Sequence, residues 1–134
     1  MVELSFVNPE GVHPPAAGYT QVVSVAGPVK VLYISGQVPK NQENEIVGKG
    51  NLEAQTRQVY QNLEIVLRSM GATFDDVVKQ TIYTTQISQV HIIRTVRAEF
   101  LNDKRPPAST LVGVTSLVDP AFLIEIEAVA VLKE

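Results

Sequence analysis

The stretch LIEIEAVAVL, residues 123–132, decides the fold, because it indicates a strand with one wholly apolar face. Side chains of a strand alternate between its two faces, and the even-numbered residues from 124 to 132 are all apolar. The other face carries two carboxylates, Glu125 and Glu127, on residues roughly 6.5–7 Å apart. The role of two adjacent acids in an otherwise buried strand is the first question that the sequence raises.

The bulk composition is that of an ordinary globular chain. Its 134 residues are most simply one domain, 1–134, with 45% hydrophobic and 19% charged residues. A net charge of −3 gives no bulk attraction for nucleic acid or an anionic membrane. The absence of cysteine excludes disulfides, thiolate catalysis and Cys-ligated metal sites. The sequence shows neither a signal-peptide pattern nor an apolar run of membrane length, so we expect a cytoplasmic protein.

The first half of the chain contains strand patterns and a polar loop. Two β-rich runs at 20–25 and 30–35 are broken by the turn signal Gly27-Pro28, and they predict a hairpin. The polar loop that follows is expected to hold a short strand at 45–47.

The segment NLEAQTRQVYQNLEIVLRSMG, residues 51–71, has apolar residues at helical spacing. Asn51 can serve as its N-cap, and Gly71 fits the left-handed position at its C-terminal end. The remaining patterns predict a strand at 77–85, a second helix at 88–102, and two closing strands at 108–115 and 121–132.

This order of elements predicts the fold class. Helices that alternate with strands indicate an α/β (α+β) protein, and a mixed sheet with both helices on one face is the compact arrangement. We also expect the two closing strands to pair antiparallel, which would make Ser109 and Glu125 face the same cavity.

Other readings of the polar residues have little support. The spacing of Glu125 and Glu127 suits an inverting glycosidase, but the chain has no tryptophan and only 6% aromatic residues for a sugar cleft. The two histidines, His13 and His91, have no partner ligands at a known spacing, so no metal site is predicted. The remaining structural reading is that the acidic face is partly solvated or lies at a subunit contact, with each glutamate hydrogen-bonded.

Several stretches taken together resemble the RidA/YjgF family over roughly residues 5–132. They are YTQVV, ISGQVP, the helix 51–71 with the strand after it, PPASTLVGVTSL and IEIEAVAV. The resemblance implies a chorismate-mutase-like fold with two helices packed on one face of the sheet. It also implies a homotrimer with a cleft at each subunit interface.

The resemblance further implies a chemistry. Family members hydrolyse reactive 2-imino or enamine acids, such as 2-aminoacrylate, to 2-keto acids and ammonia, without a metal or organic cofactor. Glu125, the first glutamate of Glu-Ile-Glu-Ala, would orient the attacking water and take a proton as the water adds to the imine carbon. Glu127 has no matching role and is expected to be structural.

The cleft residues of the family carry over one by one. They comprise a tyrosine that closes the cleft, a serine and a glycine that line it, a pocket-wall residue of the second helix, and the first residues of the second strand of the site. In this chain these positions are Tyr19, Ser35 with Gly36, Ile93, and Ser109 with Thr110.

The chain departs from the family pattern at Ser109. Typical deaminases of the family read Pro-Ala-Arg at this point, and the arginine holds the substrate carboxylate in a bidentate, charge-assisted pair. Losing such a contact costs about 1.5–3 kcal/mol, which corresponds to roughly tenfold to a few hundredfold in rate. Arg105 lies four positions earlier, and its reach to the cleft is opposed by two stiff prolines.

Two functions therefore remain open. The first is a divergent hydrolase of imines or enamines with altered carboxylate recognition, and the second is a non-catalytic trimeric module that binds a small metabolite in the interface cleft. The family has also been linked to RNA cleavage, but the acidic pI near 5.4 and the absence of a basic stripe argue against a nucleic-acid partner.

Overall fold

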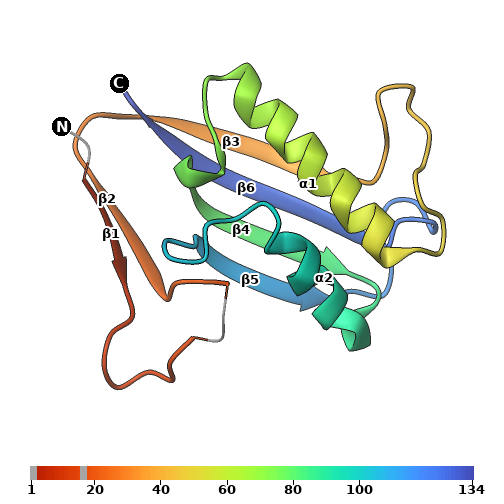
Figure 1. Ribbon diagram of the computed structural model, residues 1–134, viewed down its shortest axis with the longest axis horizontal. Coiled ribbons are helices and arrows are strands. Elements are labelled where there is room, and N and C mark those ends of the chain that lie inside the picture. Colours follow the sequence, from red (N-terminus) through yellow and green to blue (C-terminus); the bar gives the residue numbers. More distant parts are fainter. Residues whose placement is uncertain (1–2, 16–17) are drawn as a thin grey trace.

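The computed structural model describes residues 3–15 and 18–134. A four-stranded sheet in the order β3-β6-β4-β5 carries two helices on one face, and a separate two-stranded ribbon, β1-β2, lies at one end (Figure 1). The elements are β1 Glu3–Val7, β2 Val22–Ala26, β3 Val29–Gln37, α1 Leu52–Ser69, β4 Val77–Thr84, α2 Val90–Arg97, β5 Ala108–Gly113 and β6 Ile124–Lys133.

The topology explains why both helices lie on the same face. β6 runs antiparallel to β3 and to β4, and β4 runs parallel to β5. The chain thus makes two parallel crossovers, β3-α1-β4 and β4-α2-β5, that step across the sheet in the same direction. Right-handed crossovers place both helices on one side. The predicted mixed sheet with two helices on one face is confirmed.

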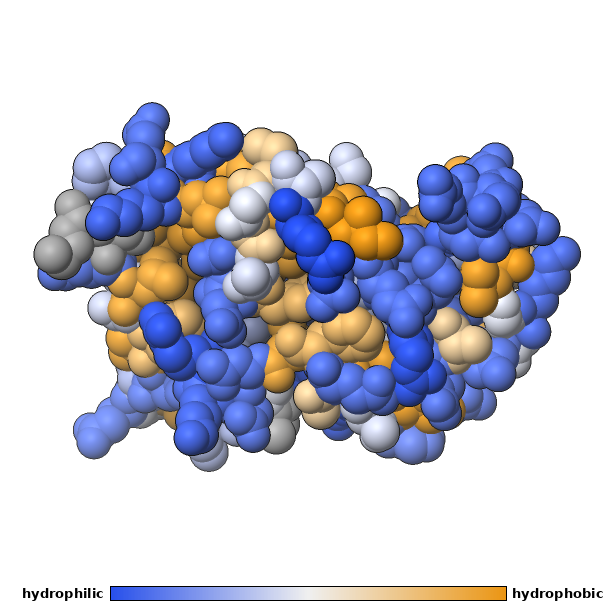
Figure 2. All heavy atoms as spheres, turned by 45° about the horizontal axis from the view of Figure 1, so that its top comes forward, coloured by the Kyte–Doolittle hydropathy of each residue, from blue (hydrophilic) through white to orange (hydrophobic). Residues whose placement is uncertain are grey.

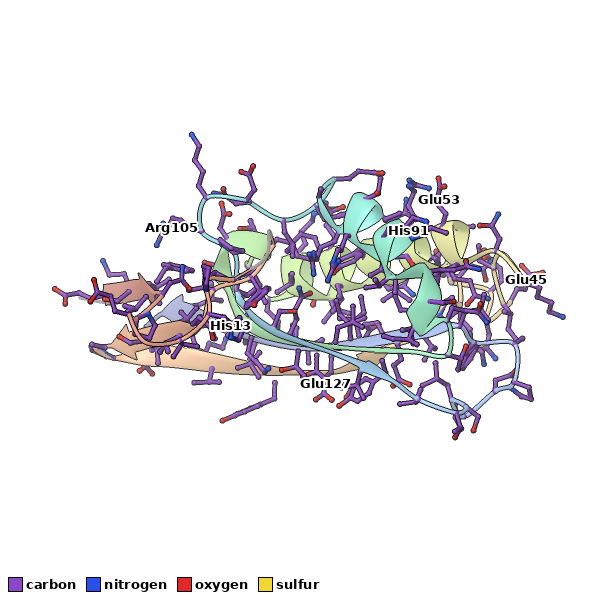
Figure 3. All side chains as sticks on the ribbon, turned by 90° about the horizontal axis from the view of Figure 1, so that it is seen from below. His13, Glu45, Glu53, His91, Arg105 and Glu127 are labelled. Carbon is purple, nitrogen blue, oxygen red and sulfur yellow. The ribbon has the colours of Figure 1, made fainter. Side chains whose placement is uncertain are left out.

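The LIEIEAVAVL stretch forms the centre of this sheet. In β6 the side chains of Ile124, Ile126, Ala128 and Ala130 are buried under the helices, in one core with Tyr60, Leu63 and Leu67 of α1. Glu125 and Glu127 point to the opposite face, which we call the open face. Figure 3 shows Glu127 on the side of the sheet away from both helices.

The structure corrects two predicted strand pairings. The runs at 20–25 and 30–35 do not form a hairpin, because β2 pairs with β1 while β3 pairs with β6. The closing strands do not pair with each other either, since β4 lies between β5 and β6. The neighbour of β5 is β4, a parallel strand joined to it by α2, and not β6 as predicted.

The predicted ends are confirmed for the first helix and wrong for the second. α1 is confirmed with its caps: the Asn51 side chain accepts from the Ala54 amide at 3.0 Å, and Gly71 has φ +78°. The second helix is shorter than 88–102, because one three-residue 3-10 turn, Ile87–Gln89, precedes it and i→i+3 bonds follow it, such as Phe100 N–H to the Arg97 carbonyl at 3.0 Å. The short strand predicted at 45–47 is a single bridge between Lys40 and Ile46.

A buried glutamine of α1 holds the segment that leads into β6. Gln55 has no exposed surface. Its amide nitrogen donates to the Ala121 carbonyl at 2.9 Å, and its amide oxygen accepts from the Leu123 backbone N–H at 2.8 Å. One side chain thus satisfies two backbone groups on a segment more than sixty positions away in the sequence, and it fixes the point at which β6 enters the sheet.

We predict that Gln55→Leu lowers the free energy of unfolding by about 2–4 kcal/mol, because it leaves these two backbone groups without partners. Urea denaturation measures the change. Gln61→Leu, at an exposed position of the same helix, is the matched control and should lie within about 0.5 kcal/mol of wild type. Equal stabilities of the two variants would contradict the role given to Gln55.

Candidate functional site

The open face has an irregularity opposite its acids. β3 pairs Ile34 with Ala128 and then Gln37 with Ile126, so Ser35 and Gly36 together stand opposite Glu127 alone. This two-against-one pairing is a β-bulge, a feature that re-aims side chains and occurs often beside functional sites. The predicted cleft residues Ser35 and Gly36 therefore lie next to the acidic pair.

The Glu125 side chain packs directly against the backbone of Gly36. A Cβ built at Gly36 would approach Glu125 Oε2 most closely, and it would lie 2.8 Å from Cδ and 3.0 Å from Cγ of the same side chain. Any side chain at position 36 would therefore displace the carboxylate. The Ser-Gly pair and Glu125, which were predicted separately, meet at one point.

The electrostatics of the two acids differ. Burial raises the pKa of Glu125, and the neighbouring charge of Glu127 raises it further. Glu127 is exposed and accepts a hydrogen bond from the Tyr83 hydroxyl at 2.7 Å, which raises the pKa of Tyr83. Among the described residues, no donor is hydrogen-bonded to the Glu125 carboxylate. Its oxygens are therefore available to a ligand or a water, whereas Glu127 is engaged by a tyrosine.

Two other predicted residues lie together at the β5 edge of the sheet. Thr20 forms a parallel bridge with Ala108, and its backbone N–H donates to the Pro107 carbonyl at 3.1 Å. Tyr19 directly precedes this bridge, and Ser109 follows it within β5 on the side opposite Ala108. Both residues are half-buried.

Within one chain these two groups lie on opposite faces of the sheet. Ser109 is in register with Gln80 of β4, which the helix residue Tyr60 contacts, whereas Glu125 is in register with Tyr83. Positions 80 and 83 are three apart, an odd number, so the two side chains face opposite ways. The expectation that Ser109 and Glu125 face one cavity because their strands pair was therefore wrong.

Two further predicted positions differ from expectation. Ile93 has no exposed surface and belongs to the core under α2, so it packs against the sheet instead of forming a pocket wall. Thr110 lies on the open face, where its hydroxyl accepts from Lys79 Nζ at 2.8 Å. It is thus on the side of Glu125 and not on the side of its neighbour Ser109.

Arg105 is occupied elsewhere in this chain. Its guanidinium lies 4.7 Å from the centre of the Phe6 ring, a cation–π contact with β1. Figure 3 shows Arg105 on the helix side of the sheet and far from Glu127. In the part of the chain that the structure describes, Arg105 therefore does not replace the arginine that is missing at position 109.

Sequence reasoning missed the side chains contributed by β4. Tyr83 and Gln80 read as ordinary members of a β-branched strand, and only the pairing of β4 with both β5 and β6 brings them to the two groups. The available signal was that Gln80 and Thr84 interrupt the apolar, helix-facing side of the strand.

No three side chains of the His, Asp and Glu type come together as metal ligands would in the described part of the chain. None of its helices is long and apolar enough to cross a membrane.

The chain matches known proteins over nearly its whole length. The model of the family described as Endoribonuclease L-PSP matches residues 11–132. The chain belongs to this family. Its members include the RidA/YjgF proteins, or Rid proteins, and the resemblance found in the sequence is confirmed.

Named relatives support the same assignment. The 3-aminoacrylate deaminase RutC of Acinetobacter baylyi is 34% identical over 124 residues, which is 92% of this chain and 94% of RutC. A RutC family protein of Pyrococcus horikoshii is 33% identical over 116 residues, 87% of this chain and 88% of the relative. The crystal structure of YyfB from Yersinia pestis, described as a Rid protein of unknown function, superposes with a TM-score of 0.85 at 37% identity, covering 96% of this chain and 98% of that one.

We predict that Glu127→Gln lowers the pKa of Glu125, because it removes one of the two causes that raise it. The pKa should stay above that of an ordinary glutamate, since burial is the larger cause and remains. Titration of the Glu125 carboxyl carbon by NMR measures the change. Tyr83→Phe keeps the charge of Glu127 and is the matched control, for which Glu125 should stay near its wild-type pKa. An unchanged titration in Glu127→Gln would mean that burial alone sets the value.

Proposed function

We propose that this Rid protein hydrolyses reactive imines or enamines of the 2-aminoacrylate type to a carbonyl product and ammonia. The observation that carries the proposal is the half-buried carboxylate of Glu125, which rests on the backbone of Gly36 and has a raised pKa. The likeness to a 3-aminoacrylate deaminase over 92% of the chain supports a small unsaturated amine as the substrate.

The chemistry requires one base and a water molecule. Glu125 orients the water and takes a proton from it as its oxygen adds to the carbon of the protonated imine, which gives a neutral carbinolamine. Glu125 then returns the proton to nitrogen, and the hydroxyl group gives up its own proton as the C–N bond breaks. Ammonia leaves with that proton as ammonium, and the carbonyl compound remains. A raised pKa suits this task, because it makes the carboxylate a stronger base. Neither a metal nor an organic cofactor takes part in the proposed reaction.

We propose that the site is completed at the interface of a homotrimer. Glu125 and Gly36 on the open face and Tyr19 with Ser109 on the helix side would then belong to neighbouring subunits that share a cleft. The surface supports such an assembly: on the open face Tyr33 is 84% exposed and Val31 is 41% exposed. Orange patches in Figure 2, which shows the helix-bearing side, mark further apolar side chains at the surface of the molecule outside the open face.

The free edge of β3 adds to this support. A cavity of about 600 Å³ lies between this edge and α1, lined by Gly36, Val38, Ile65 and Val66, and Ile65 is 60% exposed. An unpaired strand edge beside exposed apolar side chains is a surface that proteins normally cover. A neighbouring subunit would cover it close to Glu125.

Trimer formation is tested by light scattering. We expect about three times the chain mass of 14.6 kDa. Tyr33→Asp should shift the population to smaller species, because it places a charge on the surface to be buried. Ile87→Asp is the control, because Ile87 is exposed and lies away from the open face, and it should leave the mass unchanged. A wild-type protein that stays monomeric at high concentration would contradict the shared cleft.

Ser109 favours an altered substrate preference within this function. A serine offers one neutral hydrogen bond where relatives hold a carboxylate with a guanidinium, and Arg105 is engaged with Phe6. An anionic substrate would approach Glu125 without that compensating charge. The same observation favours the alternative function, a trimeric module that binds a small metabolite without converting it.

We predict that wild-type protein releases ammonia only weakly from enzymatically generated 2-aminoacrylate, and that Ser109→Arg raises kcat/KM at least about tenfold. The reason is that the guanidinium supplies two directed donors and a positive charge for the carboxylate. Ammonia release above the spontaneous rate is the measurement. Glu125→Gln keeps the shape of the site and should lower the rate by about 10²–10⁴ in either background.

The outcomes separate the two functions. Full activity of wild type on 2-aminoacrylate would contradict the importance given to Ser109. Ammonia release no faster than the spontaneous rate in both proteins, with folding intact by circular dichroism, would favour the metabolite-binding module.

A further inference from the structure

A buried arginine on α2 has no part in the chemistry above. Arg97 is 7% exposed, and within residues 3–15 and 18–134 it is the only charged residue that is buried. Its helix neighbours Ile93 and Val96 have no exposed surface. Burial lowers the pKa of Arg97, because a charged group loses its hydration there. A guanidinium in such a place is costly and calls for a task that an apolar side chain would not perform.

The guanidinium lies directly against the backbone of Gly18. A Cβ built at Gly18 would approach Arg97 Nη2 most closely, and it would lie 2.7 Å from Cζ and 3.0 Å from Nε. Gly18 has φ +99°, in the region that favours glycine. Two properties of this one position, its backbone angle and its missing side chain, therefore suit the approach of the arginine.

The next residues of the same segment are fixed to β5. The Thr20 hydroxyl donates to the Pro106 carbonyl at 2.6 Å, and the Thr20 backbone N–H donates to the Pro107 carbonyl at 3.1 Å. Thr20 is 3% exposed. Tyr19 is thus held between two fixed points, with Arg97 on one side of it and the start of β5 on the other.

Arg97 is also linked to Ser109 through Tyr60 and Gln80. The charge of Arg97 acts on Tyr60, whose hydroxyl donates to Gln80 Oε1 at 3.1 Å. Gln80 is in register with Ser109, and its buried amide nitrogen has no hydrogen-bond partner among the residues that the structure describes. Arg97 therefore lies on the face of the sheet to which Ser109 points.

We propose that Arg97 is a positioning residue, whose guanidinium holds Gly18 so that Tyr19 is fixed at the β5 edge beside Ser109. Its part in substrate binding rests on the proposed function, whereas its hold on the segment 18–20 does not. An arginine suits this task because its planar guanidinium can lie against a flat stretch of backbone over several atoms and is polar. An aliphatic side chain could fill the same space but has no polar group. The arginine acts through Tyr19 and does not touch the substrate.

The first test replaces Arg97 with methionine, which has a similar length and no charge, so that the fold is retained. Amide hydrogen exchange of Thr20, measured by NMR, should become at least about tenfold faster, since the segment loses one of its two anchors. The Val47 amide, which donates to the Pro39 carbonyl at 2.9 Å in a different loop, is the control and should not change. Unchanged exchange at Thr20 would overturn the proposal.

The second test measures how firmly the guanidinium is held at Gly18. Gly18→Ala and Gly11→Ala both place a Cβ on a backbone with positive φ, but nothing lies within 4 Å of the Cβ at Gly11. Gly18→Ala should therefore increase the unfolding equilibrium constant at least about fivefold more than Gly11→Ala does. In the Arg97→Met background this difference should shrink to within about twofold. Equal effects of the two alanines in wild type would contradict a held arginine.

Activity gives the final readout and separates this inference from the proposed function. In Arg97→Met we expect KM to rise about fivefold or more with kcat within about twofold, because Tyr19 contributes to binding, and Arg97→Lys should recover part of the loss. A role limited to core packing would lower stability and leave KM unchanged. If wild type shows no hydrolysis, the proposed function fails, while Thr20 exchange and the glycine comparison still decide the role of Arg97.

Discussion

The structure depends on one strand whose two faces have opposite solvation. β6 runs through the middle of the sheet between β3 and β4, so its backbone is paired on both sides along most of its length. On one face Ile124, Ile126, Ala128 and Ala130 complete the core under the helices. A shift of register by one residue would bury both glutamates and expose that apolar row, which makes any other register strongly unfavourable. The positions of the acids are therefore fixed by the hydrophobic residues between them.

This constraint answers the question raised by the two acids. The same alternation that buries the isoleucines presents Glu125 and Glu127 side by side, but their surroundings make them different. Glu127 is exposed and bonded to Tyr83, while Glu125 lies over Gly36, where burial disfavours its charge. Two chemically identical groups on one face of the strand thus acquire separate properties, one beside the bulge in β3 and the other from Tyr83 in β4.

The sequence predicted the local elements well and the long-range pairings poorly. α1 was found with its caps, because an asparagine and a glycine mark its ends and the apolar period is strong. β2 was predicted to pair with β3 across Gly27-Pro28. A turn signal marks where a strand ends, but it does not show which strand is the partner. The pairing of β5 with β4 depends on a helical crossover, and no residue pattern within β5 reveals its partner.

The candidate site shows the same limit. Glu125, Ser35 and Gly36 come from separate motifs, and their meeting on the open face was predictable only through the family resemblance. Ile93 was expected to form a pocket wall because the family resemblance places such a residue on the second helix, whereas here it is fully buried in the core. A buried cation such as Arg97 cannot be distinguished in a sequence from a solvated one. Burial is a property of the packed layers, so it becomes visible only when the layers are assembled.

The central place of β6 also has a consequence for how the chain reaches this structure. Val29 pairs with Lys133, so joining β3 to β6 closes a loop that contains both helices, β4 and β5. The β4-α2-β5 unit needs only nearby contacts and can form early, whereas the sheet lacks its middle until two distant segments meet. We therefore expect slow, β-like refolding kinetics despite the helices. The acidic pair and the bulge that distinguishes its members would be assembled in that same late step.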